Sequence, residues 1–386
     1  MDAVRYREVF PSRAVEVVGA LDLPVSGAGR VRPRRLPAWT RSQMPSENFD
    51  FVVSMTSGVR IVTRTAATVI ELVADFVSIA PPGIEPAPVV LELVVEGVPR
   101  ARRVVRVDHS TLVDPERYAV RRQGEPAAVR FSGLEPGEKT VELWLPHTCA
   151  VDLLEIRSDA PLRTAERSRP RWVHHGSSIS QGGEASAPTR TWPVVAARLA
   201  GVDVLNLGFS GNAVGDPFVA RTIRDLPADA ISLEIGINVV NGDLMRRRAF
   251  EPVMHGFLDT IRDGHPDAPL LLIGPIPCPS VESLPGPTVI RGGMAASAGD
   301  PRQLAEGAMS LSVVRDALAA VLRNRRDDAL HYLDGRALLR PAEVSDLDDG
   351  LHPNARALVR MGQRFARTAF AEGGPLAPRL ARSASR

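Results

Sequence analysis

The pattern of apolar residues changes near residue 159, and this change constrains the fold more than any other feature of the sequence. Between about 50 and 158, short β-branched runs follow one another without helical periodicity between them. After this point, short apolar runs alternate with segments of helical periodicity. Strands without helices are typical of antiparallel sheets, whereas strands that alternate with helices are typical of parallel ones. The sequence therefore predicts two domains of different class.

The first domain is expected over residues 1–160 as an antiparallel β-sandwich preceded by an N-terminal arm. The arm, residues 1–45, is rich in Pro, Arg and Gly, and we expect it to run irregularly or to lie against the surface. Seven strands are predicted, at residues 59–62, 68–73, 89–95, 101–107, 127–131, 140–145 and 151–156. Turn signals such as Pro81-Pro82-Gly83 separate them, and short strands at this spacing indicate a sandwich.

The second domain is expected over residues 161–372 as a doubly wound parallel α/β sheet, followed by a disordered tail at 373–386. Strands are predicted at 172–175, 204–207, 230–235, 270–276 and 330–333, and helices at 191–200, 218–226, 249–263, 303–324 and 354–371. Residues 277–301 form a long Pro/Gly-rich segment, which predicts a functional cover or a mobile loop. Ligands of such sheets bind at the carboxyl ends of the strands, so we expect the chemistry there.

Charge and composition argue against nucleic-acid and membrane partners. The net charge is +2 and aromatic residues make up 5% of the chain, whereas nucleic-acid binding favours a basic surface with interleaved aromatics. No stretch reaches the ~20 apolar residues of a membrane span, and no run of about 7–15 apolar residues marks a signal peptide. Cys149 and Cys278 form no CxxC or zinc spacing and are interpreted as buried thiols. We therefore expect a cytoplasmic protein with small-molecule partners and leave its oligomeric state open.

Several cofactor motifs are absent or broken. The segment Gly133–Thr140 approaches a phosphate-binding P-loop, but Glu138 stands where a glycine must precede the lysine, and its carboxylate would repel a phosphate. No GxGxxG follows a strand, and no HExxH or His/Cys cluster points to a catalytic metal. The GxSxG elbow of α/β-hydrolases is also missing. We therefore expect neither a bound cofactor nor a metal ion.

Four short polar blocks each follow a predicted strand or lead into the last helix, and they carry the functional signal. The first, residues 176–180, contains Ser178, which is a candidate nucleophile, although an isolated serine in such a place is more often a helix cap. The second, residues 206–212, has closely spaced glycines. Such glycines let backbone N–H groups approach a ligand, or they form an ordinary turn.

The third block ends in Asn238, whose side-chain amide can donate to an oxyanion or form a turn. The fourth, residues 349–354, has Asp349 three residues before His352, which places both in one turn. The carboxylate can then orient the imidazole and stabilise its charged form, as acid–base chemistry requires. Each block alone is weak evidence for a catalytic site. Their order along successive strands makes the evidence stronger.

Together the blocks Gly-Ser-Ser-Ile-Ser, Asn-Leu-Gly-Phe-Ser-Gly-Asn, Glu-Ile-Gly-Ile-Asn and Asp-Gly-Leu-His-Pro-Asn resemble the SGNH or GDSL hydrolase superfamily over roughly residues 171–371. The resemblance implies a three-layer α/β/α, flavodoxin-like catalytic domain. The preceding domain is similar to the jelly-roll-like β-sandwich that some members carry.

The resemblance also implies the roles of the site residues. It makes Ser178 the nucleophile and His352 the general base, with Asp349 orienting the imidazole. The oxyanion hole would comprise the backbone N–H groups of Ser178 and Gly211 and the side-chain amide of Asn238. Acyl transfer needs these parts, because an oxyanion develops on the carbonyl when the serine attacks.

Two positions depart from the pattern of the superfamily. Ser177 stands where an Asp usually precedes the nucleophile, and Val239 stands where an Asp often follows the asparagine. Neither position carries a proton in the expected mechanism, so we expect the chemistry to be retained with altered support or substrate preference. His174 and His175 are expected to be structural, although His175 could reach the rim of the site. Glu234 is expected to buttress the strand end or pair with an arginine, without a catalytic role.

Three functions fit parts of this pattern. The chain is similar to superfamily acyltransferases that load a salicylyl group from a coenzyme A thioester onto a tetracycline scaffold. We therefore expect an acyltransferase that moves an acyl group, aromatic groups included, from acyl-coenzyme A as co-substrate to an alcohol of a polyketide-type natural product. The alternative is an esterase of the acetyl or carbohydrate esterase kind. A non-catalytic binding module is disfavoured, because all the reactive blocks are present.

Overall fold

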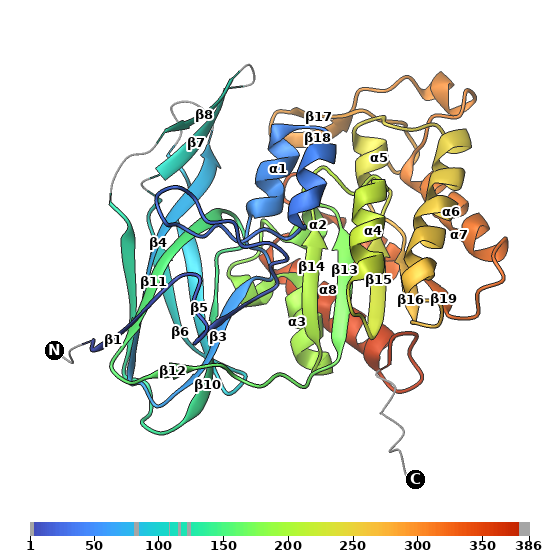
Figure 1. Cartoon of the computed structure of the whole chain (residues 1–386). Helices are drawn as coiled ribbons and strands as arrows, with labels where there is room; N and C mark the ends of the chain where they lie inside the picture. Colours follow the sequence, from blue (N-terminus) through green and yellow to red (C-terminus); the bar gives the residue numbers. More distant parts are fainter. Residues whose placement is uncertain (1–3, 81–84, 108, 115–116, 122–124, 378–386) are drawn as a thin grey trace, which may run out of the picture. The chain divides into compact units, whose positions relative to one another are not determined.

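The computed structural model describes residues 4–80, 85–107, 109–114, 117–121 and 125–377, which form two compact units (Figure 1). The first unit contains the chain up to Ser168 together with the short segment Ser186–Thr189. The second contains Arg169–Ala185 and the chain from Arg190 onward. The polypeptide therefore leaves the second unit once, adds four residues to the first, and returns.

Two sheets, each of six strands, build the first unit. The order in one sheet is β1 (Tyr6–Val9), β11 (Ala150–Ser158), β4 (Val69–Ala80), β7 (His109–Asp114) and β8 (Arg117–Arg121), with β9 (Ala127–Ser132) paired to β4. The order in the other is β12 (Leu162–Arg163), β3 (Arg60–Thr65), β10 (Lys139–Trp144), β5 (Val89–Val95) and β6 (Val98–Val105), with β2 (Glu16–Val18) paired to β3. Every pair is antiparallel except β4 with β7. The predicted β-sandwich is confirmed.

Alternation along the strands explains why this segment forms a sandwich. In β10, Val141 and Leu143 are buried, whereas Thr140 and Glu142 between them are only partly covered. Successive side chains of a strand point to opposite faces, so such a pattern gives each sheet one apolar face. Phe131 of β9 and the two buried residues of β10 belong to one hydrophobic cluster, which fills the sandwich.

The N-terminal region is more regular than predicted. The prediction that residues 1–45 run irregularly is wrong for two segments, because β1 pairs with β11 and β2 pairs with β3. Helix α1 (Glu47–Ser54) was also not predicted, although Ser46 caps it by accepting a hydrogen bond from the Phe49 N–H at 3.1 Å. The short strands β7, β8 and β12 were missed as well.

A five-stranded parallel sheet forms the centre of the second unit. Its order is β14 (Asp203–Gly208), β13 (Arg171–Gly176), β15 (Ala230–Glu234), β16 (Leu270–Ile273) and β19 (Leu330–Leu333). The first strand in sequence therefore lies between the second and the third, which is the order of flavodoxin-like folds. All residues of β15 and β16 are buried, as their continuous apolar runs indicate. The predicted α/β fold is confirmed.

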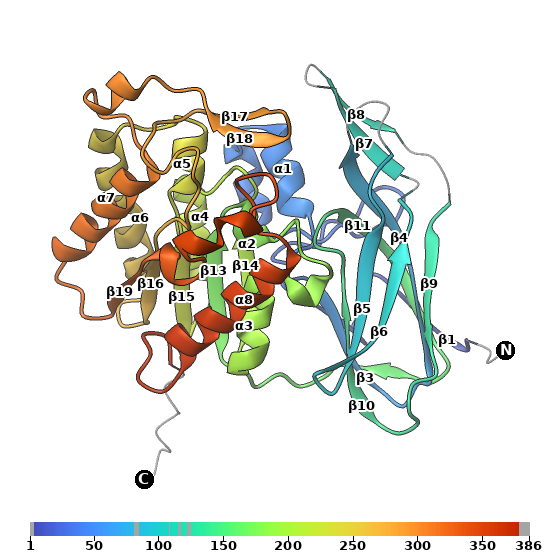
Figure 2. The ribbon, with the colours of Figure 1, turned by 180° about the vertical axis from the view of Figure 1, so that it is seen from behind.

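Helices cover both faces of this sheet. On one face α3 (Trp192–Ala200) packs against α8 (Ala355–Phe365), in front of the sheet in Figure 2. On the opposite face α4 (Pro217–Asp225) packs against α6 (Arg247–Gly264), in front of the sheet in Figure 1. Helix α7 (Leu311–Arg323) packs against α6 and β19.

The segment 277–301 is not a structureless loop. It contains an antiparallel hairpin, β17 (Thr288–Arg291) and β18 (Met294–Ser297), which its weak sequence pattern does not indicate. Its role as a cover stays a prediction. Of the predicted tail, residues 378–386 lie outside the described residues. Within its first residues Leu376 is buried, and its N–H donates to the Ala369 carbonyl at 2.8 Å, so these residues are folded.

Candidate active site

The carboxyl ends of three neighbouring strands bring the first three polar blocks together. Strands β14, β13 and β15 are adjacent and parallel, so the loops that follow them leave the sheet at one edge. Two hydrogen bonds of 3.0 Å join these loops. The Ser210 N–H donates to Gln181 Oε1, and the Ala213 N–H donates to Asn238 Oδ1. The order of strands also reverses here, which is where such folds bind their ligands.

Ser178 opens α2 (Ser178–Gln181), a single helical turn directly after β13. Ser177 caps this turn, because its Oγ accepts a hydrogen bond of 3.2 Å from the backbone two residues later. A Cβ at Gly176 would lie 2.3 Å from Ser180 Oγ. Glycine is therefore required at this position for α2 to lie so close to the end of the strand.

Ser178, His352 and Asp349 are hydrogen-bonded in series. Ser178 Oγ lies 2.9 Å from His352 Nε2, and His352 Nδ1 lies 2.7 Å from Asp349 Oδ2. A carboxylate can only accept, so Nδ1 carries a proton. In the neutral imidazole Nε2 is then the acceptor that faces the serine hydroxyl. Such an arrangement can deprotonate the hydroxyl as the serine attacks.

The Asp349 carboxylate is held in its charged form. Burial by itself raises the pKa of this group. The hydrogen bonds from the backbone N–H and imidazole of His352 and from the Leu351 N–H outweigh that effect, and the pKa lies below its ordinary value. A negative charge is therefore present at neutral pH to stabilise an imidazolium on His352.

The loop that carries this pair is held by three other segments. The Ala295 N–H of β18 donates to the Asp349 carbonyl at 2.7 Å. The Cys278 thiol donates to the Gly350 carbonyl at 3.2 Å. Beyond the histidine, Asn354 caps α8 through its side-chain oxygen. The hairpin, the loop after β16 and α8 together fix the loop.

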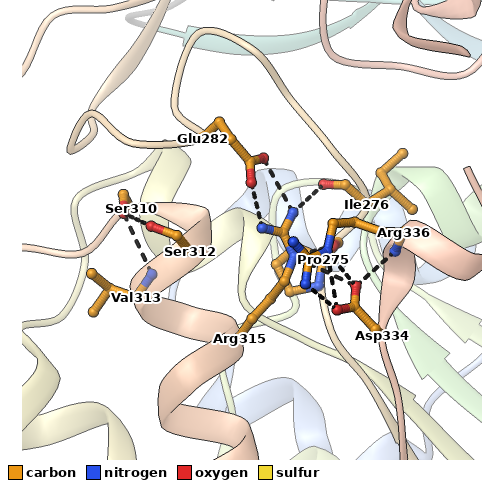
Figure 3. A network of polar contacts seen from close by, with 9 residues as sticks. All are labelled: Pro275, Ile276, Glu282, Ser310, Ser312, Val313, Arg315, Asp334 and Arg336. Atoms are coloured by element: carbon orange, nitrogen blue, oxygen red, sulfur yellow. Dashed lines mark hydrogen bonds and ion pairs between the residues drawn. The ribbon is translucent and has the colours of Figure 1, made fainter. Parts of the chain in front are cut away.

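Arg315 of α7 anchors the loop that contains Cys278. Its guanidinium donates to the Pro275 carbonyl at 3.0 Å and to Glu282 at 2.5 Å, at two ends of the loop (Figure 3). Asp334 lies on its other side at 3.8 Å. The Arg315 side chain is 5% exposed, and a buried charge with several charge-assisted hydrogen bonds holds its partners firmly.

The expected oxyanion donors lie on the two adjacent loops. Gly211 has φ +72°, and a Cβ there would meet nothing within 4 Å, so open space lies beside its backbone. Asn238 is 6% exposed, and its Oδ1 accepts the Ala213 N–H. This bond sets the orientation of the side-chain amide and leaves its Nδ2 hydrogens as donors.

Gly208 is required for close packing behind the nucleophile. A Cβ there would lie 2.5 Å from the Gln181 nitrogen and 2.6 Å from the Ser180 carbonyl carbon, both in the backbone of α2. Gly208→Ala is therefore expected to destabilise the protein by about 1–3 kcal/mol and to lower activity, because α2 must shift. Thermal unfolding and ester turnover measure the two effects. Gly256→Ala, in a helix with no neighbour within 4 Å, is the control and should not destabilise.

Glu343 ties the segment before the catalytic loop to α8. Hydrogen bonds from Arg364, at 2.6 Å to each oxygen, lower the pKa of Glu343 from 4.5 to about 2. Because the folded-state pKa is depressed, the stabilisation is present above about pH 4.5 and is lost as the pH falls toward 2.

Glu343→Gln should therefore lower the free energy of unfolding by about 1–3 kcal/mol at pH 7. The difference from the wild type should shrink below pH 4.5. Urea unfolding between pH 7 and pH 3 measures this, with the exposed Glu306→Gln as control. A difference that stayed constant with pH would contradict the assignment.

The two neighbouring histidines are structural, as expected. His174 and His175 are both fully buried on β13. His175 Nδ1 lies 2.8 Å from the Leu207 carbonyl, and burial lowers the pKa of His175 to about 4. Among the described residues Glu234 pairs with no arginine, and its carboxylate accepts hydrogen bonds from Ser177 and Ser180 beyond the strand end, in line with the first of its two expected roles. The signal that could have found this contact is a charged residue at the end of the apolar strand Ala-Ile-Ser-Leu-Glu.

The described residues meet neither the requirements of a metal site nor those of a membrane-spanning helix. Over the part of the chain that the structure describes, no three His, Cys, Asp or Glu side chains gather in a way that could hold a metal ion. Within the same residues, we find no helix with the length and apolar character needed to cross a bilayer.

Residues 175–357 match the model of the GDSL-like Lipase/Acylhydrolase family. This range contains Ser178, Asp349 and His352, the three residues bonded in series. Residues 175–357 thus form a GDSL-like lipase/acylhydrolase domain, and the chain is an enzyme that carries this domain. A search among curated protein sequences gives no match.

Several solved structures resemble the whole chain. It is similar to the salicylyl-acyltransferase SsfX3 from a tetracycline biosynthetic pathway, with 28% identity, a TM-score of 0.79, and coverage of 94% of this chain and 96% of that one. A Bacteroides ovatus protein classed as a GDSL-like lipase is 21% identical over 93% and 96% of the two chains, with a TM-score of 0.64. A family two carbohydrate esterase from Cellvibrio japonicus is 11% identical over 94% and 96%, with a TM-score of 0.60. The last two similarities concern the fold.

Proposed function

We propose that this enzyme is an acyltransferase that works through an acyl-enzyme on Ser178. The donor would be a coenzyme A thioester, aromatic acyl groups of the salicylyl kind included, and the acceptor an alcohol of a polyketide-type natural product. The single observation that carries the serine chemistry is the 2.9 Å contact between Ser178 Oγ and His352 Nε2, continued to Asp349. The similarity to SsfX3 over both units supports transfer as the outcome.

In the first half-reaction Ser178 Oγ attacks the thioester carbonyl, and its proton passes to His352 Nε2. Asp349 stabilises the imidazolium that forms. The carbonyl oxygen becomes an oxyanion, for which the N–H groups of Ser178 and Gly211 and the amide of Asn238 are the proposed donors. The carbon–sulfur bond then breaks, and the departing thiolate takes the proton from His352, which leaves an ester on Ser178.

In the second half-reaction an acceptor alcohol replaces the thiol. His352 takes the proton of the alcohol, whose oxygen attacks the acyl-enzyme, and the proton then returns to Ser178 as the new ester leaves. No metal ion or bound cofactor enters either step of this proposal. Because coenzyme A thioesters are cytoplasmic metabolites, we place the reaction in the cytoplasm.

Hydrolysis is the second candidate, since water can replace the alcohol in the same half-reaction. The match to a family of lipases and acylhydrolases favours it. The enzyme would then be an esterase that removes small acyl groups, with the same triad.

Intact-protein mass spectrometry separates the two candidates. The protein is exposed briefly to a panel of acyl-coenzyme A thioesters, aromatic ones included, with Ser178→Ala as control. We expect an adduct of acyl mass in the wild type alone, discharged faster by an added alcohol than by water. No adduct with any thioester, together with Ser178-dependent cleavage of acetate esters, would establish the esterase instead.

A further inference from the structure

A buried series of hydrogen bonds leads to Glu234, the residue that contacts Ser177 beside the nucleophile. It begins at Trp172 on β13, whose Nε1 donates to Ser232 Oγ on β15 at 2.8 Å. Ser232 Oγ lies 2.7 Å from His174 Nδ1, and His174 Nε2 lies 2.8 Å from Ser180 Oγ on α2. Ser180 Oγ donates to Glu234 Oε2 at 3.1 Å. All five side chains are at most 3% exposed.

The groups at the two ends of this series determine which atom donates in each hydrogen bond. The indole of Trp172 only donates, so Ser232 Oγ accepts from it. Burial and the neighbouring His175 lower the pKa of His174 well below its ordinary value, which favours the neutral imidazole. Because Ser180 gives its only proton to Glu234, the His174 proton lies on Nε2, and Nδ1 accepts from Ser232. The Nε2 proton is donated to Ser180, which donates in turn to Glu234. Each hydrogen bond of the series thus has one donor and one acceptor, and the series ends on a carboxylate, which accepts.

Glu234 also binds the residue that precedes the nucleophile. Its Oε2 accepts from the Ser177 N–H at 2.8 Å and from Ser177 Oγ at 2.7 Å. Together with Ser180, this places three donors on one carboxylate oxygen. Burial raises the pKa of Glu234, and the three donors counteract the rise because they favour the charged form.

The three contacts fix both ends of the turn that carries Ser178. Ser177 is the cap of α2 and Ser180 lies in its single turn, so Glu234 holds the residues on either side of the nucleophile. The carboxylate beside the nucleophile is thus supplied by the end of the adjacent strand β15 and not by residue 177. From this geometry we infer that Glu234 is the positioning residue that sets the Ser178 hydroxyl against His352. The inference rests on the proposed role of Ser178.

The test measures how fast Ser178 reacts with a fluorophosphonate probe, which needs no knowledge of the substrate. The serine oxygen displaces fluoride from phosphorus and forms a phosphonate ester, and the serine proton passes to His352. Glu234→Gln keeps the shape of the side chain but replaces one oxygen by a donor. We expect its labelling rate and its kcat for ester cleavage to fall about 10- to 100-fold, with KM within about twofold, because the nucleophile is misplaced.

A double substitution separates positioning from general support of the fold. Ser177→Asp alone places two carboxylates in one buried contact and should lower the labelling rate strongly. Ser177→Asp combined with Glu234→Gln restores a single carboxylate, and we expect it to label faster than Ser177→Asp alone. Asp327→Asn, which breaks the 2.8 Å pair with Arg262 before β19, is the matched control and should label at the wild-type rate.

The outcomes distinguish a failure of the proposed function from a failure of this inference. Wild-type protein that is not labelled at Ser178 would overturn the proposed function, and with it this inference. Labelled wild type, with folded Glu234→Gln reacting at the same rate, would overturn the inference alone, as would a double variant no faster than Ser177→Asp. If Glu234→Gln does not fold, Ser177→Ala removes the 2.7 Å bond to Glu234, and an unchanged rate in that variant would overturn the inference.

Discussion

Ser178→Ala should lower kcat/KM at least about 10⁴-fold while the protein stays folded, because the oxygen that attacks the acyl group is gone. His352→Ala should cost about as much, since the hydroxyl cannot lose its proton without the base 2.9 Å away. The two losses should not add in the double variant. Nucleophile and base act as one unit, so removing either removes the function of both.

Turnover of a simple aryl ester and circular dichroism of the same samples measure the two parts of this prediction. Ser186→Ala is the matched control, because Ser186 is an exposed serine outside the hydrogen-bonded series of Ser178, His352 and Asp349. Near-wild-type turnover in either folded variant would show that the assigned triad is wrong. If Ser178→Ala loses turnover because it unfolds, the measurement is repeated with Ser178→Cys, which retains a nucleophile and has a similar volume.

Asn238→Ala is expected to lower kcat by about 10²–10³-fold, or about 2.7–4 kcal/mol of transition-state stabilisation, as loss of an oxyanion donor does. The loss should fall on kcat more than on KM, because the negative charge on oxygen exists only in the transition state. Steady-state kinetics with an activated ester measure this split.

Asn238→Asp separates the donor from the local structure. A carboxylate keeps the acceptor for the Ala213 N–H, which is bonded to Asn238 Oδ1 at 3.0 Å, but it has no N–H to offer an oxyanion. We therefore expect Asn238→Asp to be at least as inactive as Asn238→Ala and to remain folded. A loss below tenfold in the alanine variant would remove Asn238 from the oxyanion hole.

The arrangement of the site could be predicted because it follows from sheet topology. Continuous apolar runs mark buried parallel strands, and the carboxyl ends of neighbouring parallel strands share one edge. Polar residues placed directly after such strands, as Ser178 and Asn238 are, must therefore lie near each other. Asp349 and His352 were found because a three-residue spacing puts both side chains in one turn.

Contacts between distant segments could not be predicted in the same way. Strand β1 exists because it pairs with β11, and nothing in its own four residues specifies that partner. The hairpin of β17 and β18 has strands of four residues, too short for a periodic signal. The contact of Glu234 with Ser177 depends on the rotamer and depth of a single side chain, which a linear pattern does not encode.

The two units cannot be separated by a single cut in the gene. Ser186–Thr189 belong to the first unit, while the chain on both sides belongs to the second. A fragment that starts at Arg169 therefore carries these four residues without the rest of the first unit. In the whole chain Glu92 accepts from the Thr189 N–H at 3.1 Å and from its hydroxyl at 2.6 Å. The fragment loses both hydrogen bonds to this carboxylate, each with a net value of about 1.5–3 kcal/mol. Truncation, domain exchange and directed evolution should therefore treat the β-sandwich as part of the catalytic polypeptide rather than as a detachable module.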